Sequence, residues 1–155
     1  MKTLYMSQMG TVRPPDSLRT TLGSCIGIVL YDKKTKLFGL AHIMLPDSNG
    51  SNGNLGKYAD TAVPELLKQM EVPEYRHSDV IAKIAGGANM FGKNSNTQSI
   101  QIGKQNIEAV RSILADYRIA IVSEDVGGEK GRQLVIDGSN ESVLVNQIGD
   151  TPKAL

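Results

Sequence analysis

The sequence has a single cysteine, Cys25, and two histidines among its 155 residues. One cysteine cannot form an internal disulfide, and so few cysteines and histidines argue against a zinc site built from them. The chain also has no excess of one charge, because 17 lysines and arginines against 16 acidic residues leave a formal net charge of +1. That balance gives neither the basic surface typical of nucleic-acid-binding proteins nor a basic block for anionic membranes.

Long apolar runs are absent as well. No stretch approaches the ~20 apolar residues that cross a bilayer, and the first residues lack the apolar segment of a secretory signal. We therefore expect a soluble, cytoplasmic protein, in which a lone thiol stays reduced. The length, with 40% hydrophobic and 21% charged residues, predicts one compact domain over residues 1–155.

Strand-like runs dominate what is present. Residues 26–31 and 37–45 are apolar on both faces, as buried strands are, and the polar residues 32–36 between them predict a hairpin turn. Further strands are expected at residues 80–85, 119–123, 133–136 and 143–147.

Two segments have the helical period instead, residues 59–70 and about 103–117. Pro64 predicts that the first helix begins near it or kinks there. Strands and a few helices mixed in this order predict α+β or α/β layers rather than a simple βαβ repeat.

Cys25 follows a Gly-Ser pair and opens the first predicted strand. One interpretation is a small core residue, since free cysteine is among the most buried residue types, and composition alone favours it. The other is a nucleophile, since a Gly-Ser turn before a rigid strand can present a side chain at the strand end. A cysteine nucleophile needs a partner that favours its thiolate, most often a histidine.

Hairpin geometry gives Cys25 one candidate partner, His42. Opposed residues of an antiparallel pair share a face and have a constant index sum. A six-residue turn places Cys25 directly opposite His42, whereas a four-residue turn places His42 opposite Gly27 and diagonal to Cys25, within reach of long side chains. An odd-numbered turn puts the two side chains on opposite faces. The pairing therefore requires an even register, and without it His42 is a hydrogen-bonded structural residue.

Other candidate positions are less specific. Thr20 and Thr21 precede the thiol, and the hydroxyl of either can orient an imidazole or bind a substrate amide. The glycine pairs at residues 86–87 and 127–128 match neither GxGxxG nor the Walker A pattern, so they predict tight turns rather than nucleotide sites. The second histidine, His77, is expected in a solvated loop.

Short motifs follow one another along the chain: TTLGSC (residues 20–25), GLAHIMLPDS (39–48), KYAD (57–60), AGGANMF (85–91), IGKQN (102–106), SEDVGG (123–128) and GR (131–132). Each is weak by itself. In this order, and over nearly the whole chain, they resemble the CheD family of chemoreceptor glutamine deamidases.

The resemblance implies an enzyme that hydrolyses specific glutamine side-chain amides of methyl-accepting chemotaxis receptors to glutamate, through a thioester and with release of ammonia. It assigns Cys25 as the nucleophile, His42 as its base and Thr20 as the third residue, with Thr21 as a possible substitute. The implied fold is a three-layer α/β/β sandwich with mixed sheets and flanking helices, similar to the cytotoxic necrotizing factor deamidases. The chemistry requires no metal or organic cofactor, and backbone N–H groups near Cys25 are expected to serve as oxyanion donors.

Two protein partners are implied by the same resemblance, namely the receptors and a CheC-type phosphatase, together with a location at chemoreceptor arrays. An alternative is a non-catalytic regulatory adaptor that binds receptors and the phosphatase while its thiol site is vestigial.

Overall fold

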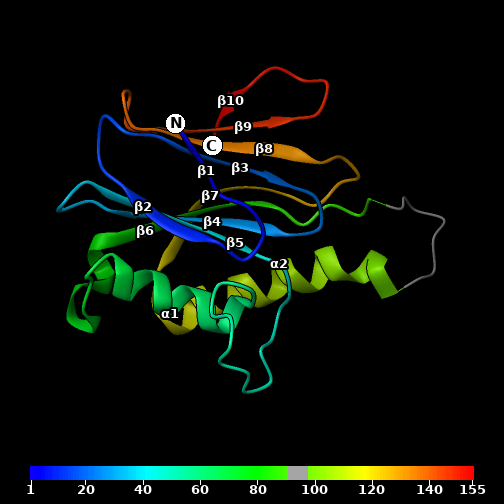
Figure 1. Ribbon diagram of the computed structural model, residues 1–155, viewed down its shortest axis with the longest axis horizontal. Coiled ribbons are helices and arrows are strands. Elements are labelled where there is room, and N and C mark those ends of the chain that lie inside the picture. Colours follow the sequence, from blue (N-terminus) through cyan, green and yellow to red (C-terminus); the bar gives the residue numbers. More distant parts are fainter. Residues whose placement is uncertain (91–97) are drawn as a thin grey trace.

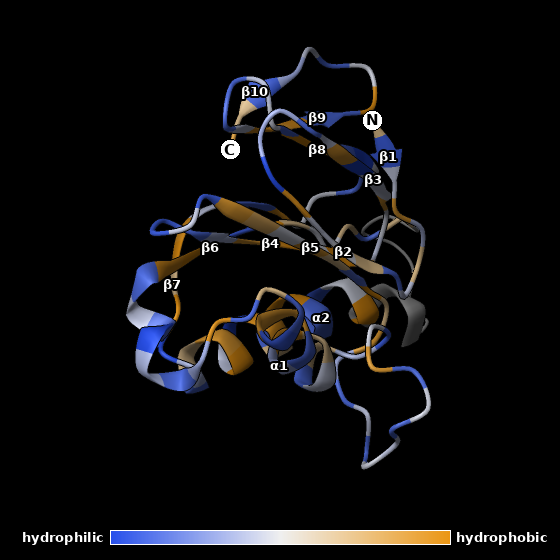
Figure 2. Ribbon diagram, turned by 60° about the vertical axis from the view of Figure 1, so that its left-hand side comes forward, coloured by the Kyte–Doolittle hydropathy of each residue, from blue (hydrophilic) through white to orange (hydrophobic). Residues whose placement is uncertain are grey.

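The computed structural model describes residues 1–90 and 98–155, and it stacks a layer of helices on two β-sheets. The order of the layers is visible in Figures 1 and 2, where the helices cover one face of a central sheet and the second sheet covers its other face. The expected three-layer α/β/β sandwich is therefore confirmed. Phe91, which ends the AGGANMF motif, lies outside the described residues.

The elements follow one another in the order β1 (Lys2–Thr3), β2 (Met9–Val12), β3 (Leu18–Leu22), β4 (Ile26–Asp32), β5 (Leu37–Ile43), α1 (Ala59–Gln69), the 3-10 helix η1 (Glu74–Asp79), β6 (Val80–Gly86), α2 (Gln98–Asp116), β7 (Ala120–Val126), β8 (Arg132–Asp137), β9 (Ser142–Gln147) and β10 (Lys153–Ala154). None of the described helices combines the length and the apolar character that crossing a membrane takes.

Both sheets are mixed, as expected. The central sheet has the strand order β2-β5-β4-β6-β7, in which β6 and β7 run parallel and the other neighbours antiparallel. The outer sheet has the order β1-β3-β8-β9-β10, in which β1 and β3 are the parallel pair.

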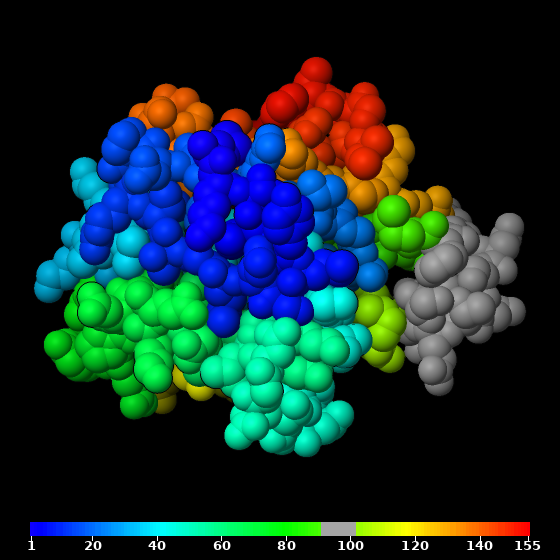
Figure 3. All heavy atoms as spheres, viewed as in Figure 1, coloured from blue at the N-terminus to red at the C-terminus, as the bar shows by residue number. Residues whose placement is uncertain are grey.

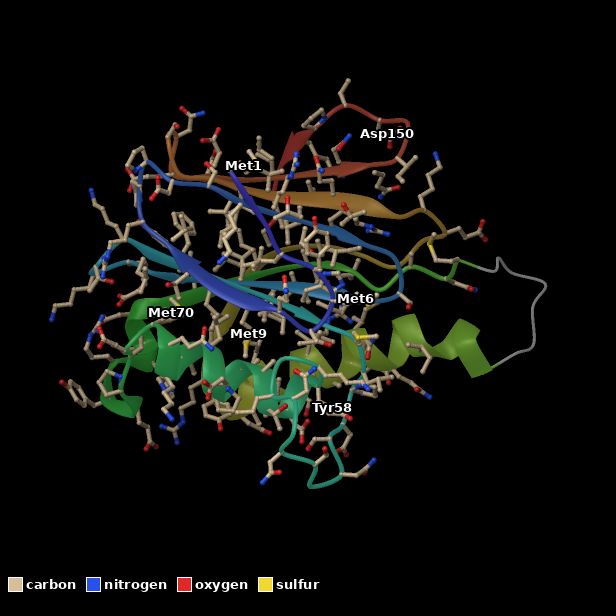
Figure 4. All side chains as sticks on the ribbon, viewed as in Figure 1. Met1, Met6, Met9, Tyr58, Met70 and Asp150 are labelled. Atoms are coloured by element: carbon tan, nitrogen blue, oxygen red, sulfur yellow. The ribbon has the colours of Figure 1, made fainter. Side chains whose placement is uncertain are left out.

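The central sheet is apolar on both faces because each face covers a core. Alternate residues of β4 point to opposite sides: Ile26, Ile28 and Leu30 pack with the helices, whereas Val29 and Tyr31 pack with the outer sheet. Figure 4 shows residues of the helical side, with Met9 lying between β2 and α1 and Met70 at the end of α1. Two-sided burial explains the unbroken apolar runs that predicted these strands.

Several elements differ from the sequence expectation. The second hairpin strand ends at Ile43 rather than residue 45, because the N–H groups of Met44 and Leu45 both donate to the carbonyl of Lys57. Helix α1 begins at Ala59 and includes Pro64, and α2 begins at Gln98, earlier than expected. The elements that the sequence did not predict are short or strongly alternating: β1, β2, β3, β10 and η1.

Candidate active site

Cys25 lies in a bend directly before β4, at the end of the central sheet, and its side chain is half-buried. The glycine turn after β6 holds this bend in place. The N–H of Gly87 donates to the carbonyl of Cys25 (2.8 Å), and the N–H of Ala88 donates to the carbonyl of Gly23 (2.9 Å). Two backbone hydrogen bonds therefore fix the peptide units on either side of the thiol.

Gly86 allows this close approach. A Cβ atom at this position would stand 2.2 Å from the carbonyl oxygen of Cys25, and the residue has φ 112°, a conformation that side chains rarely adopt. The glycine pair after β6 is thus a tight turn, as expected, and it packs directly against the backbone that carries Cys25.

His42 lies on β5, in the register that the hairpin argument requires. Asp32 pairs with Leu37 and Gly27 with His42, so the turn has four residues and the predicted even register is confirmed. His42 is diagonal to Cys25, at a spacing of ~7–8 Å between Cα atoms. Cys25 packs against the core between the two sheets, and His42 faces the same side, towards the outer sheet.

Thr20 reaches His42 from the outer sheet. Its strand, β3, alternates between buried and exposed residues, so Thr20 is fully buried while Thr21 is exposed. The Oγ1 atom of Thr20 lies 2.6 Å from Nδ1 of His42 and 2.9 Å from the carbonyl oxygen of Leu4. The structure therefore brings Thr20, not Thr21, to the imidazole.

These two contacts fix the tautomer of His42. The carbonyl of Leu4 can only accept, so the single hydroxyl hydrogen of Thr20 is donated to it. Thr20 must then accept from His42, which places the imidazole hydrogen on Nδ1 and leaves the lone pair on Nε2. Nε2 is buried and has no hydrogen-bond partner within the described ranges. His42 thus has a free acceptor nitrogen, Nε2.

The segment between β1 and β2 shields this pair from solvent. The N–H of Ser7 donates to the carbonyl of His42 (2.9 Å), and the N–H of His42 donates to the carbonyl of Gln8 (3.1 Å). In Figure 3 the N-terminal residues, in dark blue, cross the middle of the visible face between the outer sheet and the helices. His42 is only 3% exposed.

Burial sets the protonation of both groups. It lowers the pKa of His42 from 6.5 to about 4, because the low-polarity surroundings disfavour the imidazolium. It also raises the pKa of the Cys25 thiol, although a hydrogen bond from the cysteine's own backbone N–H acts in the opposite direction. At neutral pH the site therefore holds a neutral thiol and a neutral imidazole.

Thr20→Val removes the hydroxyl while keeping the shape of the side chain. We expect it to lower the free energy of unfolding by about 1–3 kcal/mol, because the Leu4 carbonyl and the His42 Nδ1–H lose their partner inside the protein. The freed imidazole should slow turnover about 10- to 100-fold.

The matched control is Thr21→Val, on the exposed side of the same strand. Thermal melts and initial rates measured on both variants test the assignment. Equal effects of the two substitutions would show that the Thr20 contact has no special role.

Two further buried polar residues hold the backbone around the site. Asn106, on α2, donates to backbone carbonyls next to Cys25 and His42. Arg132, 1% exposed, donates to the carboxylate and carbonyl of Asp125 and to the carbonyl of Gly127, which orders the second glycine turn. The sequence predicted no role for either residue, although Asn106 ends the IGKQN motif and Arg132 ends the GR motif.

His77 is remote from the thiol. It lies in η1, with Nδ1 3.2 Å from the carbonyl oxygen of Tyr117. With Lys68 and Arg118 it lines a cavity of 650 Å³ at the C-terminal ends of α1 and α2, whose lining does not include Cys25 or His42. Within residues 1–90 and 98–155 no three His, Cys, Asp or Glu side chains gather to hold a metal ion.

Comparison with known proteins identifies the family of the chain. Residues 44–147 match the family model of CheD, described as chemotactic sensory transduction. A protein of Methanococcus vannielii named probable chemoreceptor glutamine deamidase CheD is 47% identical over 143 residues, which are 92% of each chain. Chemoreceptor glutamine deamidase CheD of Halalkalibacterium halodurans is 40% identical over 97% of this chain and 95% of its own.

Among solved structures, a hypothetical protein of Bacillus licheniformis, YfiH, is similar with a TM-score of 0.45 and 14% identity, over 76% of this chain and about half (51%) of that one.

The sequence relatives extend across the segments that carry Thr20, Cys25 and His42, since their alignments cover more than nine-tenths of the chain. By the family match and by these relatives, the chain belongs to the CheD family.

Proposed function

We propose that the chain is a protein-glutamine glutaminase that hydrolyses glutamine side-chain amides of chemoreceptors to glutamate. Its relatives carry the name chemoreceptor glutamine deamidase. The observation that supports the mechanism most directly is the Thr20–His42 hydrogen bond, because it leaves Nε2 of the imidazole free on the face of the sheet that Cys25 also occupies.

Cys25 and His42 can carry out the reaction with water as the only co-reactant. Sγ attacks the amide carbon while Nε2 of His42 takes the thiol proton, so that a C–S bond forms and the carbonyl electrons move to oxygen. The imidazolium then gives this proton to the leaving nitrogen, the C–N bond breaks, and ammonia departs. A thioester between Cys25 and the former glutamine remains.

Water completes the cycle. Nε2 removes a proton from water as the water oxygen attacks the thioester carbon, the C–S bond breaks, and the proton returns to sulfur. In both steps the negative charge develops on one oxygen, and we assign the backbone N–H of Cys25, which hydrogen-bonds the thiol before attack, as its donor. His42 can serve in each step because burial keeps its imidazole neutral before attack.

Mass spectrometry of a receptor fragment tests the proposal. We expect the wild-type protein to add about one mass unit for each glutamine converted, and Cys25→Ala to add none, because the thioester cannot form. Binding of the fragment to both proteins is measured in parallel. A wild-type protein that binds the fragment without changing its mass would support the adaptor alternative, and mass change by Cys25→Ala would contradict the nucleophile.

The proposal includes the two finer expectations from the sequence, a CheC-type phosphatase as a second partner and a location at chemoreceptor arrays. Membership of a family described as chemotactic sensory transduction supports a place in that system. Co-purification of the full chain with such a phosphatase, and fluorescence of a tagged chain in cells with and without receptors, test these two points separately.

A further inference from the structure

Asn106 joins the backbone before the thiol to the backbone after the imidazole. It lies on α2, is fully buried, and its Nδ2 atom is 3.0 Å from the carbonyl oxygen of Ser24 and 2.9 Å from that of Met44. Because both partners are carbonyl oxygens, only the NH2 group of the amide can face them, and both of its hydrogens are donated. The orientation of this amide is therefore fixed.

The two carbonyls belong to the point where the β4–β5 ladder ends. Ile26 pairs with Ile43 in the last rung, and Ser24 and Met44 lie just beyond it on the two strands. In this position the two hydrogen bonds of the Asn106 side chain connect the two segments beyond the last backbone pair of the ladder, and they hold these segments at a fixed separation. One of these ends carries Cys25, and the other continues from His42.

Helix α2 reaches this position because it has a glycine one turn earlier. A Cβ atom at Gly103 would stand 2.5 Å from the carbonyl oxygen of Gly87 and 2.7 Å from that of Ala88. The helix therefore lies directly against the glycine turn that also binds the Cys25 carbonyl. Without this approach the short side chain of Asn106 could not reach the ladder end.

The hydrogen bond to Ser24 has a consequence for Cys25. A trans peptide unit is planar, with its C=O and the following N–H pointing in opposite directions. Because the Ser24 carbonyl points to α2, the N–H of Cys25 points away from α2, and this N–H hydrogen-bonds the cysteine's own thiol. The same N–H is the oxyanion donor of the proposed mechanism.

From this geometry we infer that Asn106 is a positioning residue: by binding the Ser24 and Met44 carbonyls it aims the Cys25 N–H at the reacting atoms and fixes the nucleophile relative to His42. The inference rests on the proposed deamidase activity. Burial also leaves Oδ1 of Asn106 without a hydrogen-bond partner in the described part of the chain, an unfavourable arrangement for a residue with a purely structural role.

Asn106→Leu tests the inference because it keeps the approximate shape of the side chain and removes both donated hydrogens without adding a charge near the thiol. We expect kcat for deamidation to fall about tenfold or more, with KM little changed, because an oxyanion donor is misaimed. The rate of Cys25 alkylation by iodoacetamide, measured against pH, should move its midpoint upward by about one unit, because the thiolate loses a hydrogen bond. Asn106→Ala, which also removes both donors, should change kcat and the alkylation midpoint in the same directions, and it carries the test if the leucine variant does not fold.

The control is Val110→Ala, one turn further along the same buried face of α2. It should lower the melting temperature and leave kcat and the alkylation midpoint unchanged per folded molecule. An unchanged midpoint and kcat in folded Asn106 variants would overturn the inference. The alkylation readout needs no substrate, so a shifted midpoint in a chain without deamidase activity would reject the proposed function and keep the geometric role of Asn106.

Discussion

Replacement of His42 by asparagine is expected to reduce turnover by about 10²- to 10⁴-fold, the contribution typical of a positioned general base. The amide nitrogen of asparagine occupies roughly the place of Nδ1, so the variant keeps a donor for Thr20 while it loses Nε2. Because burial raises the pKa of Cys25, no preformed thiolate can replace the missing base. KM should change little, since the imidazole takes a proton and does not hold the substrate. Initial rates from the receptor-fragment mass assay give both constants.

The matched control is His77→Asn, the same change at the other histidine of the chain. His77 lines the cavity between the helix ends, away from Cys25, so its variant should keep wild-type turnover. A His42→Asn protein that folds and retains more than about a tenth of the wild-type kcat would show that another group takes the thiol proton.

The register that places His42 diagonal to Cys25 could be predicted from the sequence because it depends on local geometry. A polar five-residue segment between two apolar runs indicates a hairpin, and the strict period of a strand then leaves few registers. The structure selected the four-residue turn, with Gly27 opposite His42. Glycine there matters for packing, since a Cβ atom would stand 2.6 Å from Leu134 of the outer sheet. The same hairpin therefore fixes the register of His42 and lets the outer sheet pack closely at Gly27.

The choice between Thr20 and Thr21 could not be made from the sequence, because it depends on a contact between distant segments. β3 pairs with β8, where Thr20 lies opposite Leu134. That pairing decides which threonine is buried, and no local pattern near residue 20 encodes it. Asn106 is the same case, since it contacts Ser24 across 82 residues of sequence. The sequence shows Asn106 only as a polar residue among the apolar positions of an amphipathic helix. That pattern does not indicate which backbone groups its side chain binds.

The acid stability of the protein should also depend on His42, with a sign that follows from burial. In the folded chain the pKa of His42 is about 4, and in the unfolded chain it returns to 6.5. Between these values the unfolded state binds more protons, so the free energy of unfolding decreases as the pH falls. The stability associated with the neutral imidazole is complete above pH 6.5 and is lost progressively down to pH 4.

Comparison of wild type with His42→Asn isolates this contribution, because the other ionisable groups are the same in both proteins and their effects cancel in the difference. The lowering of the His42 pKa from 6.5 to about 4 corresponds to about 3 kcal/mol of unfolding free energy between pH 7 and pH 4. Urea unfolding at a series of pH values should therefore show wild type losing about 3 kcal/mol more than the variant over that range. If the two curves stay parallel, the pKa of His42 is the same in the folded and unfolded chains, and burial does not hold the imidazole neutral. A slope of opposite sign would indicate a thiolate–imidazolium pair in the resting site, because an imidazolium stabilised by the Cys25 thiolate binds its proton more tightly in the folded chain. The sign of one measured difference thus decides whether His42 begins the reaction as a base or as an acid.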